Sequence, residues 1–425
     1  MDINELLKGV HCACGRHHTC DIKYVYIERN AAQRLTEICR NQQNILIVAD
    51  ENTFQAAGAS VLAALDSKNV RKRIFSGKTI LVPNEAAIAA VQADLNEIDM
   101  IVGIGSGVIQ DLCKYVSFYA QLPYIIVATA PSMDGYASTG AAMITGGMKV
   151  TYPVGLPVAI LADTAVLANA PMDMIRAGYG DIIGKFSALN DWKLSHLING
   201  EYFCQYIYDL TYAQITQTID LAENILNRDE GSIKTLMEAL TMIGILMSFA
   251  GSSRPASGSE HHLSHFFEIT GILTKSEYFS HGIDVGYSTI ITAMIREAIL
   301  KNRFPDVIYR PSFEAYSKKM HALYKTSADG CIALQEKMGR YRNTTISTYL
   351  SKEKEIRNIL AEIPTAQQTE AILSRAGFDI REFYALYGKE KITDAVFYAK
   401  DLKDRYTVLW LYYDLFGGDR NVQQD

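Results

Sequence analysis

The first 165 residues alternate short apolar runs with helix-like patterns, and this alternation constrains the fold more than any other feature. Short unbroken apolar runs indicate strands that are covered on both faces. We predict strands at 44–50, 79–82, 99–104 and 123–128, with helices at 56–65, 85–95 and 109–119. Strands and helices in this order predict a parallel, Rossmann-like sheet with crossover helices.

The pattern changes beyond about residue 135. Two apolar segments, 141–145 and 148–152, flank Gly146-Gly147 and predict a hairpin, and 158–161 adds a further strand. Beyond about residue 165 the periodicity is mostly helical, with predicted helices at 210–226, 234–250, 283–299 and 392–416. We therefore expect an α/β domain at 1–165 and an all-helical domain at 166–425, with the boundary near 163–172.

Composition excludes several classes of protein. Hydrophobic residues make up 48% and charged residues 21% of the chain, as in globular proteins, and the net charge of −6 argues against a dedicated nucleic-acid or anionic-membrane binder. Residues 1–10 lack the apolar core of a secretory signal, and no unbroken apolar run reaches the ~18 residues of a membrane span. We expect a cytoplasmic protein.

The seven cysteines are odd in number and mostly scattered, which predicts reduced thiols rather than a disulfide framework. Three of them, together with two histidines, lie in the segment 12–20, CACGRHHTC. This segment has enough soft ligands for zinc, but it lacks the second ligand pair of standard zinc motifs. We therefore favour an ordinary loop or strand start here.

A glycine-rich turn, IVGIGSGVIQD at 101–111, connects a predicted strand to a predicted helix. Gly103, Gly105 and Gly107 let the backbone turn tightly, and the following helix N-terminus offers free N–H groups to a pyrophosphate. The spacing is not the GxGxxG fingerprint, because Val108 takes the third glycine's place, and no Walker motif follows. A plain strand-to-helix connection remains the alternative.

Two further polar features follow predicted strands. Asp50 ends one strand, where it either binds an adenosine ribose hydroxyl or caps the next turn. The loop 129–135, TAPSMDG, follows another strand. Ligands of parallel α/β sheets bind at the carboxyl ends of strands, so this loop is a candidate binding loop.

Four of the nine histidines lie close together in the sequence: His261, His262, His265 and His281. His261 and His265 are four residues apart in a predicted helix and share one face, whereas His262 points elsewhere. His281 begins another helical stretch, and Asp181 opens one after small residues. Two imidazoles and a carboxylate would make a catalytic metal site, although a helix-capping aspartate and a metal-free histidine pair are equally compatible with the pattern.

Five strings occur in order: GIGSGVIQD (103–111), TAPSMDGYAS (129–138), GYGD (178–181), RPASGSEHHLSH (254–265) and HG (281–282). Together they resemble the sn-glycerol-1-phosphate dehydrogenases, in the bacterial AraM-like branch. The wider superfamily comprises iron-containing alcohol dehydrogenases, glycerol dehydrogenases and dehydroquinate synthases. The resemblance covers about residues 10–300 and implies the dehydroquinate-synthase-like fold. A short string at 399–408 extends it.

The resemblance implies roles for individual residues. Asp181, His261 and His281 would hold one divalent metal ion, Zn²⁺, Ni²⁺ or Fe²⁺. Asp134, Asp181 and His265 would contact the substrate. NAD or NADP would be bound by Asp50, Gly107, Val108, Ile109, Gln110, Asp111, Thr129, Ala130, Pro131, Ser132 and Ser138.

The implied reaction is the reversible NAD(P)H-linked reduction of dihydroxyacetone phosphate to sn-glycerol 1-phosphate. The metal polarises the ketone oxygen, the nicotinamide delivers hydride, and the alkoxide takes a proton through His265, so Asp181 and His265 are the catalytic residues. Arg254, with Ser252 and Ser253, is our candidate for binding the substrate phosphate. Relatives tend to be dimers or larger, and phospholipid biosynthesis is the implied pathway.

Three alternatives stay open. A non-phosphorylated polyol dehydrogenase would need no phosphate site and would act on free glycerol or dihydroxyacetone. A dehydroquinate-synthase-like lyase shares the histidine pattern but not the SMDG string. A catalytically silent binding protein on the same fold would bind no metal.

Overall fold

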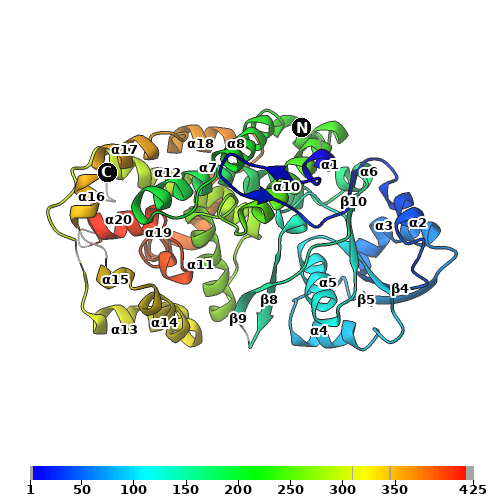
Figure 1. Cartoon of the computed structure of the whole chain (residues 1–425). Coiled ribbons are helices and arrows are strands. Elements are labelled where there is room, and N and C mark those ends of the chain that lie inside the picture. Colours follow the sequence, from blue (N-terminus) through cyan, green and yellow to red (C-terminus); the bar gives the residue numbers. More distant parts are fainter. Residues whose placement is uncertain (1–2, 147, 309, 344–345, 418–425) are drawn as a thin grey trace. The chain divides into compact units, whose positions relative to one another are not determined.

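A computed structural model describes residues 3–146, 148–308, 310–343 and 346–417 (Figure 1). The chain forms two compact units, Met1–Ile182 with Asp220–Ser253, and Ile183–Ile219 with Arg254–Asp425. The two units interleave along the sequence, and each is described by itself. The division into domains at residue 165 stays a prediction.

The first unit contains a six-stranded parallel sheet, as the alternating pattern predicts. In spatial order the strands are β3 (Tyr24–Ile27), β10 (Ala159–Ala162), β7 (Tyr124–Ala128), β6 (Met100–Gly105), β4 (Asn44–Asp50) and β5 (Asn69–Phe75). The sheet order departs from the sequence order, so helices cross over between parallel neighbours.

Alternate residues of each central strand enter two separate apolar cores, which is why the strands read as unbroken apolar runs. Ile45 and Ile47 of β4 face one core, and Leu46 and Val48 face the other. The first core is covered by η1 (Ala31–Arg34), α2 (Leu35–Ile38) and α3 (Glu51–Ala64), and the second by α4 (Glu85–Gln92) and α5 (Gly107–Ala120) (Figure 1).

One predicted strand is wrong. Residues 79–82 form no strand, and the strand lies earlier, at β5. β5 pairs only with β4 at the edge of the sheet, and it is rich in charged residues because one of its sides faces solvent. Two of the apolar residues that suggested a strand are instead exposed, Ile80 at 89% and Val82 at 46%, while Leu81 packs against the second core.

Smaller elements complete the first unit. The predicted hairpin is present as β8 (Gly140–Thr145) and β9 (Met148–Pro153), although Gly147 lies outside the described residues. A second hairpin joins β1 (Val10–His11) to β2 (His17–His18). The helices are α1 (Ile3–Leu6), η2 (Gly135–Ala137), α6 (Thr164–Ala168), α9 (Ala222–Leu226) and α10 (Glu230–Ala250).

α10 is the one described helix that is long and apolar enough to cross a membrane. However, 78% of its most apolar window is buried inside the protein, which is the property of a core helix. Its Gly244 allows close packing, since a Cβ there would lie 2.7 Å from the Cβ of Ala137 in η2. α10 thus supports the loop that follows β7.

The described part of the second unit is helical, as predicted for the second half of the chain. It contains α8 (Gln205–Ile219), α11 (Ser259–Thr274), α12 (His281–Lys301), α13 (Phe313–Tyr324), η3 (Lys325–Ser327), α14 (Ala328–Met338), α15 (Arg340–Asn343), α16 (Ile346–Ser351), α17 (Glu353–Leu360), α18 (Ala366–Ser374), α19 (Ile380–Tyr398), η4 (Ala399–Leu402) and α20 (Val408–Phe416). The long helix α7 (Met172–Asn199) begins in the first unit and continues into the second.

Two predicted helices are interrupted in the structure. The helix expected at 210–226 is divided into α8 and α9, and the helix expected at 392–416 into α19, η4 and α20. The second interruption places Lys400 in the interior, where its ammonium pairs with Asp401 and lies 3.8 Å from the ring centroid of Tyr413. The tertiary contacts of a buried charge therefore override helical periodicity here.

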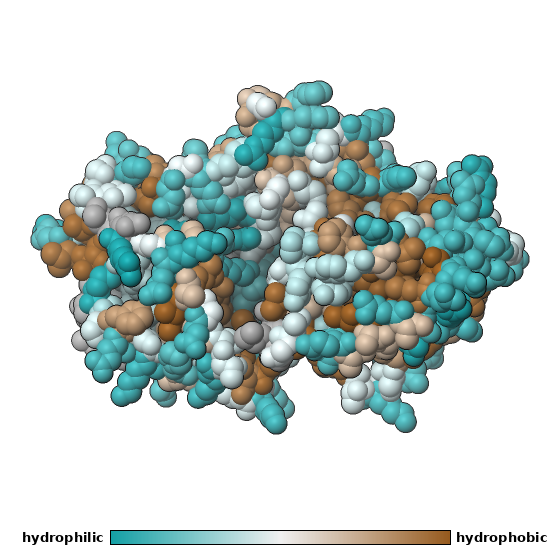
Figure 2. Space-filling model, turned by 60° about the horizontal axis from the view of Figure 1, so that its bottom comes forward, coloured by the Kyte–Doolittle hydropathy of each residue, from teal (hydrophilic) through white to brown (hydrophobic). Residues whose placement is uncertain are grey.

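Hydrophilic side chains cover much of the face shown in Figure 2, with patches of hydrophobic ones between them. The most exposed large apolar side chains are Ile80, in the first unit, and Val307 and Phe313, six residues apart in the second. Some exposed apolar side chains are ordinary on protein surfaces.

A buried carboxylate connects four helices of the second unit. Asp191 of α7 accepts hydrogen bonds from the Arg296 guanidinium of α12 at 2.9 Å and from the Val408 backbone N–H of α20 at 2.8 Å. Its other oxygen accepts from the Ser259 backbone N–H at 2.6 Å, at the start of α11. A negative charge at a helix N-terminus is favourable, and this one also neutralises Arg296.

We predict that Asp191→Asn lowers the free energy of unfolding by about 3 kcal/mol, because it leaves the Arg296 charge buried without its partner. Urea denaturation of the two proteins measures the difference. Asp173→Asn, which removes a carboxylate that is 80% exposed and pairs with Arg176, should cost less than about 1 kcal/mol. Equal effects of the two substitutions would contradict the role given to Asp191.

Candidate functional site

The first half of α7 lies against the loop that follows β7. A Cβ on Gly178 would overlap the carbonyl oxygen of Pro131, so only glycine permits this approach. Three residues later, Asp181 is fully buried, and its Oδ2 accepts a hydrogen bond from the Asp134 backbone N–H at 3.0 Å. The small residues of GYGD thus bring the loop and the carboxylate together.

The next turn of α7 packs against α11 and α12. A Cβ on Gly184 would lie 2.6 Å from the Val285 side chain and 3.3 Å from that of Glu260. α11 carries His261 in its first turn, and α12 begins at His281. This packing accounts for the observation that Asp181, His261 and His281 offer ligand atoms that all lie within 4.8 Å of one another.

This donor set fits a catalytic divalent metal. One carboxylate and two imidazoles supply three ligands and leave at least one coordination position for a substrate oxygen. Nitrogen and oxygen donors of this kind suit Zn²⁺, Ni²⁺ and Fe²⁺. Among the predicted residues, these three are therefore the ones that the structure assembles into a possible metal site.

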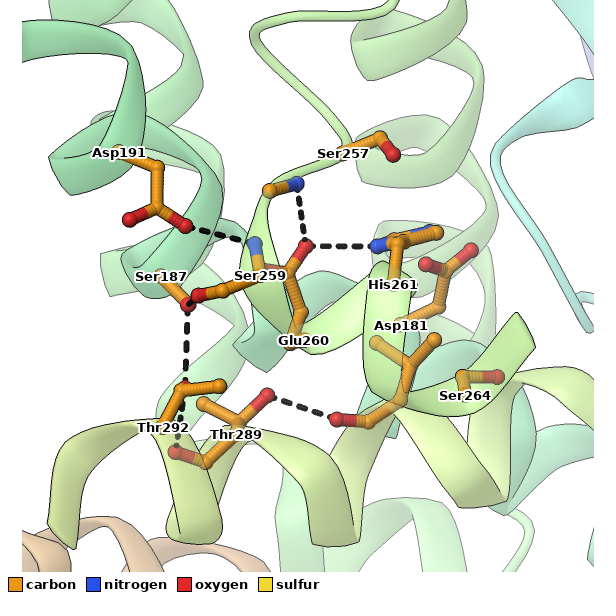
Figure 3. Close-up of polar contacts among 12 residues, drawn as sticks. Asp181, Ser187, Asp191, Ser257, Ser259, Glu260, His261, Ser264, Thr289 and Thr292 are labelled. Atoms are coloured by element: carbon orange, nitrogen blue, oxygen red, sulfur yellow. Dashed lines mark hydrogen bonds and ion pairs between the residues drawn. The ribbon is translucent and has the colours of Figure 1, made fainter. Parts of the chain in front are cut away.

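Glu260 orients His261 (Figure 3). Its Oε1 lies 2.6 Å from His261 Nδ1 and also accepts from the Gly258 backbone N–H at 2.9 Å. With its proton on Nδ1, the imidazole presents an unprotonated Nε2 as ligand. Burial, followed by the nearby charge of Asp191, raises the pKa of the Glu260 carboxyl to about 7.

The surroundings of His261 keep its ring neutral. Burial lowers its pKa well below the ordinary value, and the nearby Lys185, His281, Lys403 and His265 act in the same direction. A neutral imidazole is the form that binds metals. Lys185 and Lys403 therefore bring positive charge near the candidate metal site, which also contains the carboxylates of Asp181 and Glu260.

His265 lies one turn beyond His261 on α11, as the spacing predicts. Its ring centroid is 6.2 Å from that of His261 and 5.5 Å from that of His281. His262 points away from this group into the interior, where its two ring nitrogens have no hydrogen-bond partner in the described part of the chain. It is a packing residue.

The glycine-rich turn has a structural component. A Cβ on Gly105 would lie 2.6 Å from Ile109, and one on Gly103 would lie 2.9 Å from the sulfur of Cys113. Gly107 is different, because a Cβ there would approach only Met133, at 3.8 Å. The first two glycines are therefore needed for packing, and Gly107, at the N-terminus of α5, has space beside it for a ligand.

Lys114 holds the loop beside this turn. Its buried ammonium donates to the carbonyl oxygens of Gly135 and Gly140, each at 2.9 Å, and to Ser138 Oγ at 3.2 Å. Gln110 is also structural, since its amide donates to the Tyr136 carbonyl oxygen at 3.0 Å. These contacts hold the loop 129–138 through protein groups.

Asp50 caps α3, as one of the two sequence interpretations expects. Its Oδ1 accepts from the backbone N–H groups of Asn52 and Thr53, each at 2.9 Å. Its Oδ2 has no hydrogen-bond partner among the residues that the structure describes. A ribose hydroxyl at this oxygen is compatible with the cap, so the cofactor role of Asp50 stays a prediction.

Arg254 is held by protein groups. Its guanidinium donates to both carboxylate oxygens of Glu201, to Ser195 Oγ at 3.1 Å and to the Tyr406 carbonyl oxygen at 3.0 Å. These bonds use four of its five N–H groups. The phosphate role of Arg254 stays a prediction, and the structure indicates mainly a structural role.

Comparisons with known proteins identify the family. The model of the iron-containing alcohol dehydrogenase family matches residues 26–171. A protein of Halalkalibacterium halodurans named glycerol-1-phosphate dehydrogenase (NAD(P)+) is 35% identical over 71% of this chain and 77% of its own length. The chain belongs to the glycerol-1-phosphate dehydrogenase family. The resemblance inferred from the sequence motifs is thereby confirmed.

Other members of this family match over different lengths. The Geobacillus stearothermophilus protein of the same name is 33% identical over 66% of this chain and 71% of its own length. The Bacillus licheniformis protein of the same name is 28% identical over 94% and 90%. The family thus extends over nearly the whole chain, including the region 300–395, for which the sequence motifs are uninformative.

Solved structures establish the fold. An archaeal halo-thermophilic alcohol dehydrogenase from a Red Sea brine pool aligns with a TM-score of 0.59 at 13% identity, covering 96% of this chain and 94% of that one. A probable glycerol dehydrogenase from Sinorhizobium meliloti aligns with a TM-score of 0.54 at 18% identity, covering 85% and 98%. The fold class expected from the sequence is confirmed.

Sequence reasoning missed several residues of this glycerol-1-phosphate dehydrogenase family member. Glu260 directly precedes a predicted metal ligand, and an acid next to a ligating histidine is a signal that can be read. Lys185 lies one helical turn after Asp181, so its closeness to the site follows from helical spacing. Lys403 lies far along the chain, and no local pattern places it near His261.

We predict that Glu260→Gln weakens the binding of Zn²⁺ to the metal-free protein by about 10-fold or more, because a neutral amide polarises the His261 imidazole less. Competition with a chromogenic chelator measures the affinity directly. Glu268→Gln removes a charge seven residues further along α11, about 10 Å along the helix axis, and should leave the affinity unchanged. Wild-type affinity in Glu260→Gln would show that Glu260 only packs.

Proposed function

We propose that this protein catalyses the reversible, metal-dependent reduction of dihydroxyacetone phosphate to sn-glycerol 1-phosphate with NADH or NADPH. The observation that carries the proposal is the group Asp181, His261 and His281, with positive side chains beside it. The names of the relatives support the same substrate and cofactor.

When bound, the metal would polarise the C2 ketone oxygen and the nicotinamide would supply hydride. Asp181, His261 and His281 would hold the metal. The Asp134 backbone N–H keeps the Asp181 carboxylate in place, and Glu260 keeps His261 in the tautomer that binds metal through Nε2. Contacts of this kind, made by the protein itself, support the ligands from outside the metal's coordination shell.

His265 is our candidate for proton transfer. It is not in the candidate ligand group, yet its ring lies beside the rings of His261 and His281. An imidazole at this position is suited to give a proton to the C2 oxygen as hydride arrives, and to take it back in the reverse direction. We therefore assign His265 the role of general acid and base.

The substrate phosphate requires cationic donors, and two meet at the start of α11. Lys403 Nζ lies 3.4 Å from Ser257 Oγ, and an Arg405 guanidinium nitrogen lies 3.2 Å from the Ser257 carbonyl oxygen. Burial lowers the pKa of Arg405 to about 10, so it remains charged at neutral pH. We assign the phosphate to this pair before Arg254, which is occupied by Glu201.

The dinucleotide would bind in the first unit. The open N-terminus of α5 at Gly107–Asp111 suits the pyrophosphate, and Thr129–Ser132 and Ser138 belong to the loop held by Lys114. Asp50 Oδ2 is available to a ribose hydroxyl. We propose a cytoplasmic homodimer or larger homo-oligomer, with Zn²⁺ or Ni²⁺ as the metal and Fe²⁺ as a further possibility, and with phospholipid biosynthesis as the pathway.

The decisive experiment removes and restores the metal. Stripped protein should show no oxidation of NADH or NADPH with dihydroxyacetone phosphate, and activity should return with Zn²⁺, Ni²⁺ or Fe²⁺. The product should fail to react with a glycerol-3-phosphate dehydrogenase, as expected for the 1-phosphate enantiomer. Turnover of dihydroxyacetone with none of its phosphate would reassign the protein to polyol dehydrogenases, and metal-independent activity would overturn the proposed site.

Lys403→Met tests the phosphate assignment. Loss of one charge-assisted hydrogen bond costs about 1.5–3 kcal/mol, so we expect KM for dihydroxyacetone phosphate to rise by about 10- to 100-fold. Weak activity on dihydroxyacetone should change little, because that substrate carries no phosphate. Lys337→Met, an exposed substitution on α14, is the control. An equal loss of activity on both substrates would show that Lys403 does not bind the phosphate.

A further inference from the structure

A small hairpin near the N-terminus carries a second group of metal-ligand side chains. β1 and β2 are two residues each, with Val10 opposite His18. Between them, the Cys12 N–H donates to the Arg16 carbonyl oxygen and the Gly15 N–H to the Cys12 carbonyl oxygen, each at 3.0 Å. This tight turn projects Cys12 and Cys14 from one short loop.

The ligand atoms of Cys12, Cys14, His18 and Cys204 all lie within 4.8 Å of one another. Cys14 Sγ and His18 Nε2 are 3.4 Å apart. Tetrahedral zinc with bonds of about 2.3 Å to sulfur and about 2.0 Å to nitrogen separates its ligand atoms by roughly 3.5–3.8 Å. Three thiols and one imidazole form a standard ligand set of structural zinc sites. Cys204 supplies the ligand that the segment 12–20 lacks by itself.

Contacts that do not involve the thiols hold His18 in the tautomer that can bind a metal through Nε2. Its Nδ1 lies 3.0 Å from the Phe249 carbonyl oxygen, to which it donates, and its ring stacks on the Phe249 ring at 5.4 Å between centroids. A proton on Nδ1 leaves the lone pair on Nε2, which faces Cys14. A ligating histidine whose other nitrogen donates to a backbone carbonyl is the usual arrangement in zinc sites.

Cys20 has a different environment, although it belongs to the same sequence cluster. Its thiol hydrogen bonds within the first unit, to Ser248 and Ile22. It is absent from the ligand group. The structure thus separates two kinds of cysteine that the sequence leaves equivalent.

We propose that Cys12, Cys14, His18 and Cys204 bind a structural zinc ion, distinct from the metal of the proposed catalytic site. A hairpin with two-residue strands buries little apolar surface and gains little stability by itself. A metal that joins its loop to a distant part of the chain would supply that stability. All four coordination positions are filled by protein, so the site is closed to substrate and serves no catalytic step.

Metal analysis of the purified full-length protein tests the proposal. Elemental analysis after growth with zinc should give two ions per wild-type chain. His261→Ala/His281→Ala should retain one, and Cys12→Ser/Cys14→Ser should retain the other. His17→Gln, in the same hairpin but outside the ligand group, is the matched control and should retain two.

Cobalt substitution provides a readout that does not depend on hairpin variants folding. In His261→Ala/His281→Ala, bound Co²⁺ should show thiolate-to-metal charge transfer and the intense visible bands of tetrahedral coordination. Metal should also protect three thiols from an aromatic disulfide reagent, and chelation should release them. Cys204→Ser should abolish the charge transfer or reduce it by about one third.

The expected outcomes are separable from those of the proposed function. A Cys12→Ser/Cys14→Ser protein that keeps metal-dependent turnover while losing one zinc would support a structural site. One zinc per wild-type chain, lost entirely in His261→Ala/His281→Ala, would overturn the proposal. So would the absence of thiolate charge transfer in the cobalt protein, whatever the reductase assays show.

Discussion

The carboxylate of Asp191 is the contact on which the candidate catalytic site depends. It accepts from the first N–H of α11 at Ser259, and His261 follows two residues later in the same turn. The direction in which α11 leaves Asp191 therefore sets the position of the imidazole. Arg296 neutralises the carboxylate and connects it to α12, the helix that begins with the candidate ligand His281.

α7 connects Asp191 to Asp181, the third candidate metal ligand. Asp181 and Asp191 lie on one continuous helix, so the ligand and the anchor keep a constant separation. Glycines make the neighbouring contacts possible: Gly178 admits the Pro131 carbonyl, and Gly184 admits Val285. A larger residue at either position would separate the helix from the elements that complete the site. The packing of α7 at these two glycines therefore helps to determine where the candidate metal ligands lie.

Much of the fold could be predicted from sequence periodicity. The wrongly predicted strand and the interrupted helix have a common cause. Strands covered on both faces read as apolar runs and were predictable, whereas β5 is a polar edge strand whose stability comes from pairing with β4 alone. The helix interruption at η4 was likewise invisible, because it depends on rings contributed by other helices around Lys400. Periodicity reports local burial, and both exceptions are determined by non-local partners.

The same distinction applies to the candidate sites. Asp181, His261 and His281 could be proposed from motifs, since each motif carries its own signal. By contrast, Lys403 and Cys204 have no local signal, and only the folded chain brings them beside the ligands that they complement. The proposed catalytic site and the proposed zinc site of the hairpin also differ in the groups that would fill their coordination positions.

At the proposed catalytic site, three side chains would hold the metal, and Lys185 and Lys403 lie near His261. A phosphorylated substrate would bring an anion to these cationic groups. By thermodynamic linkage, such a substrate strengthens metal binding as much as the metal strengthens substrate binding. At the hairpin, three thiolates exceed the charge of Zn²⁺ and fill the coordination shell with His18, so nothing further is needed.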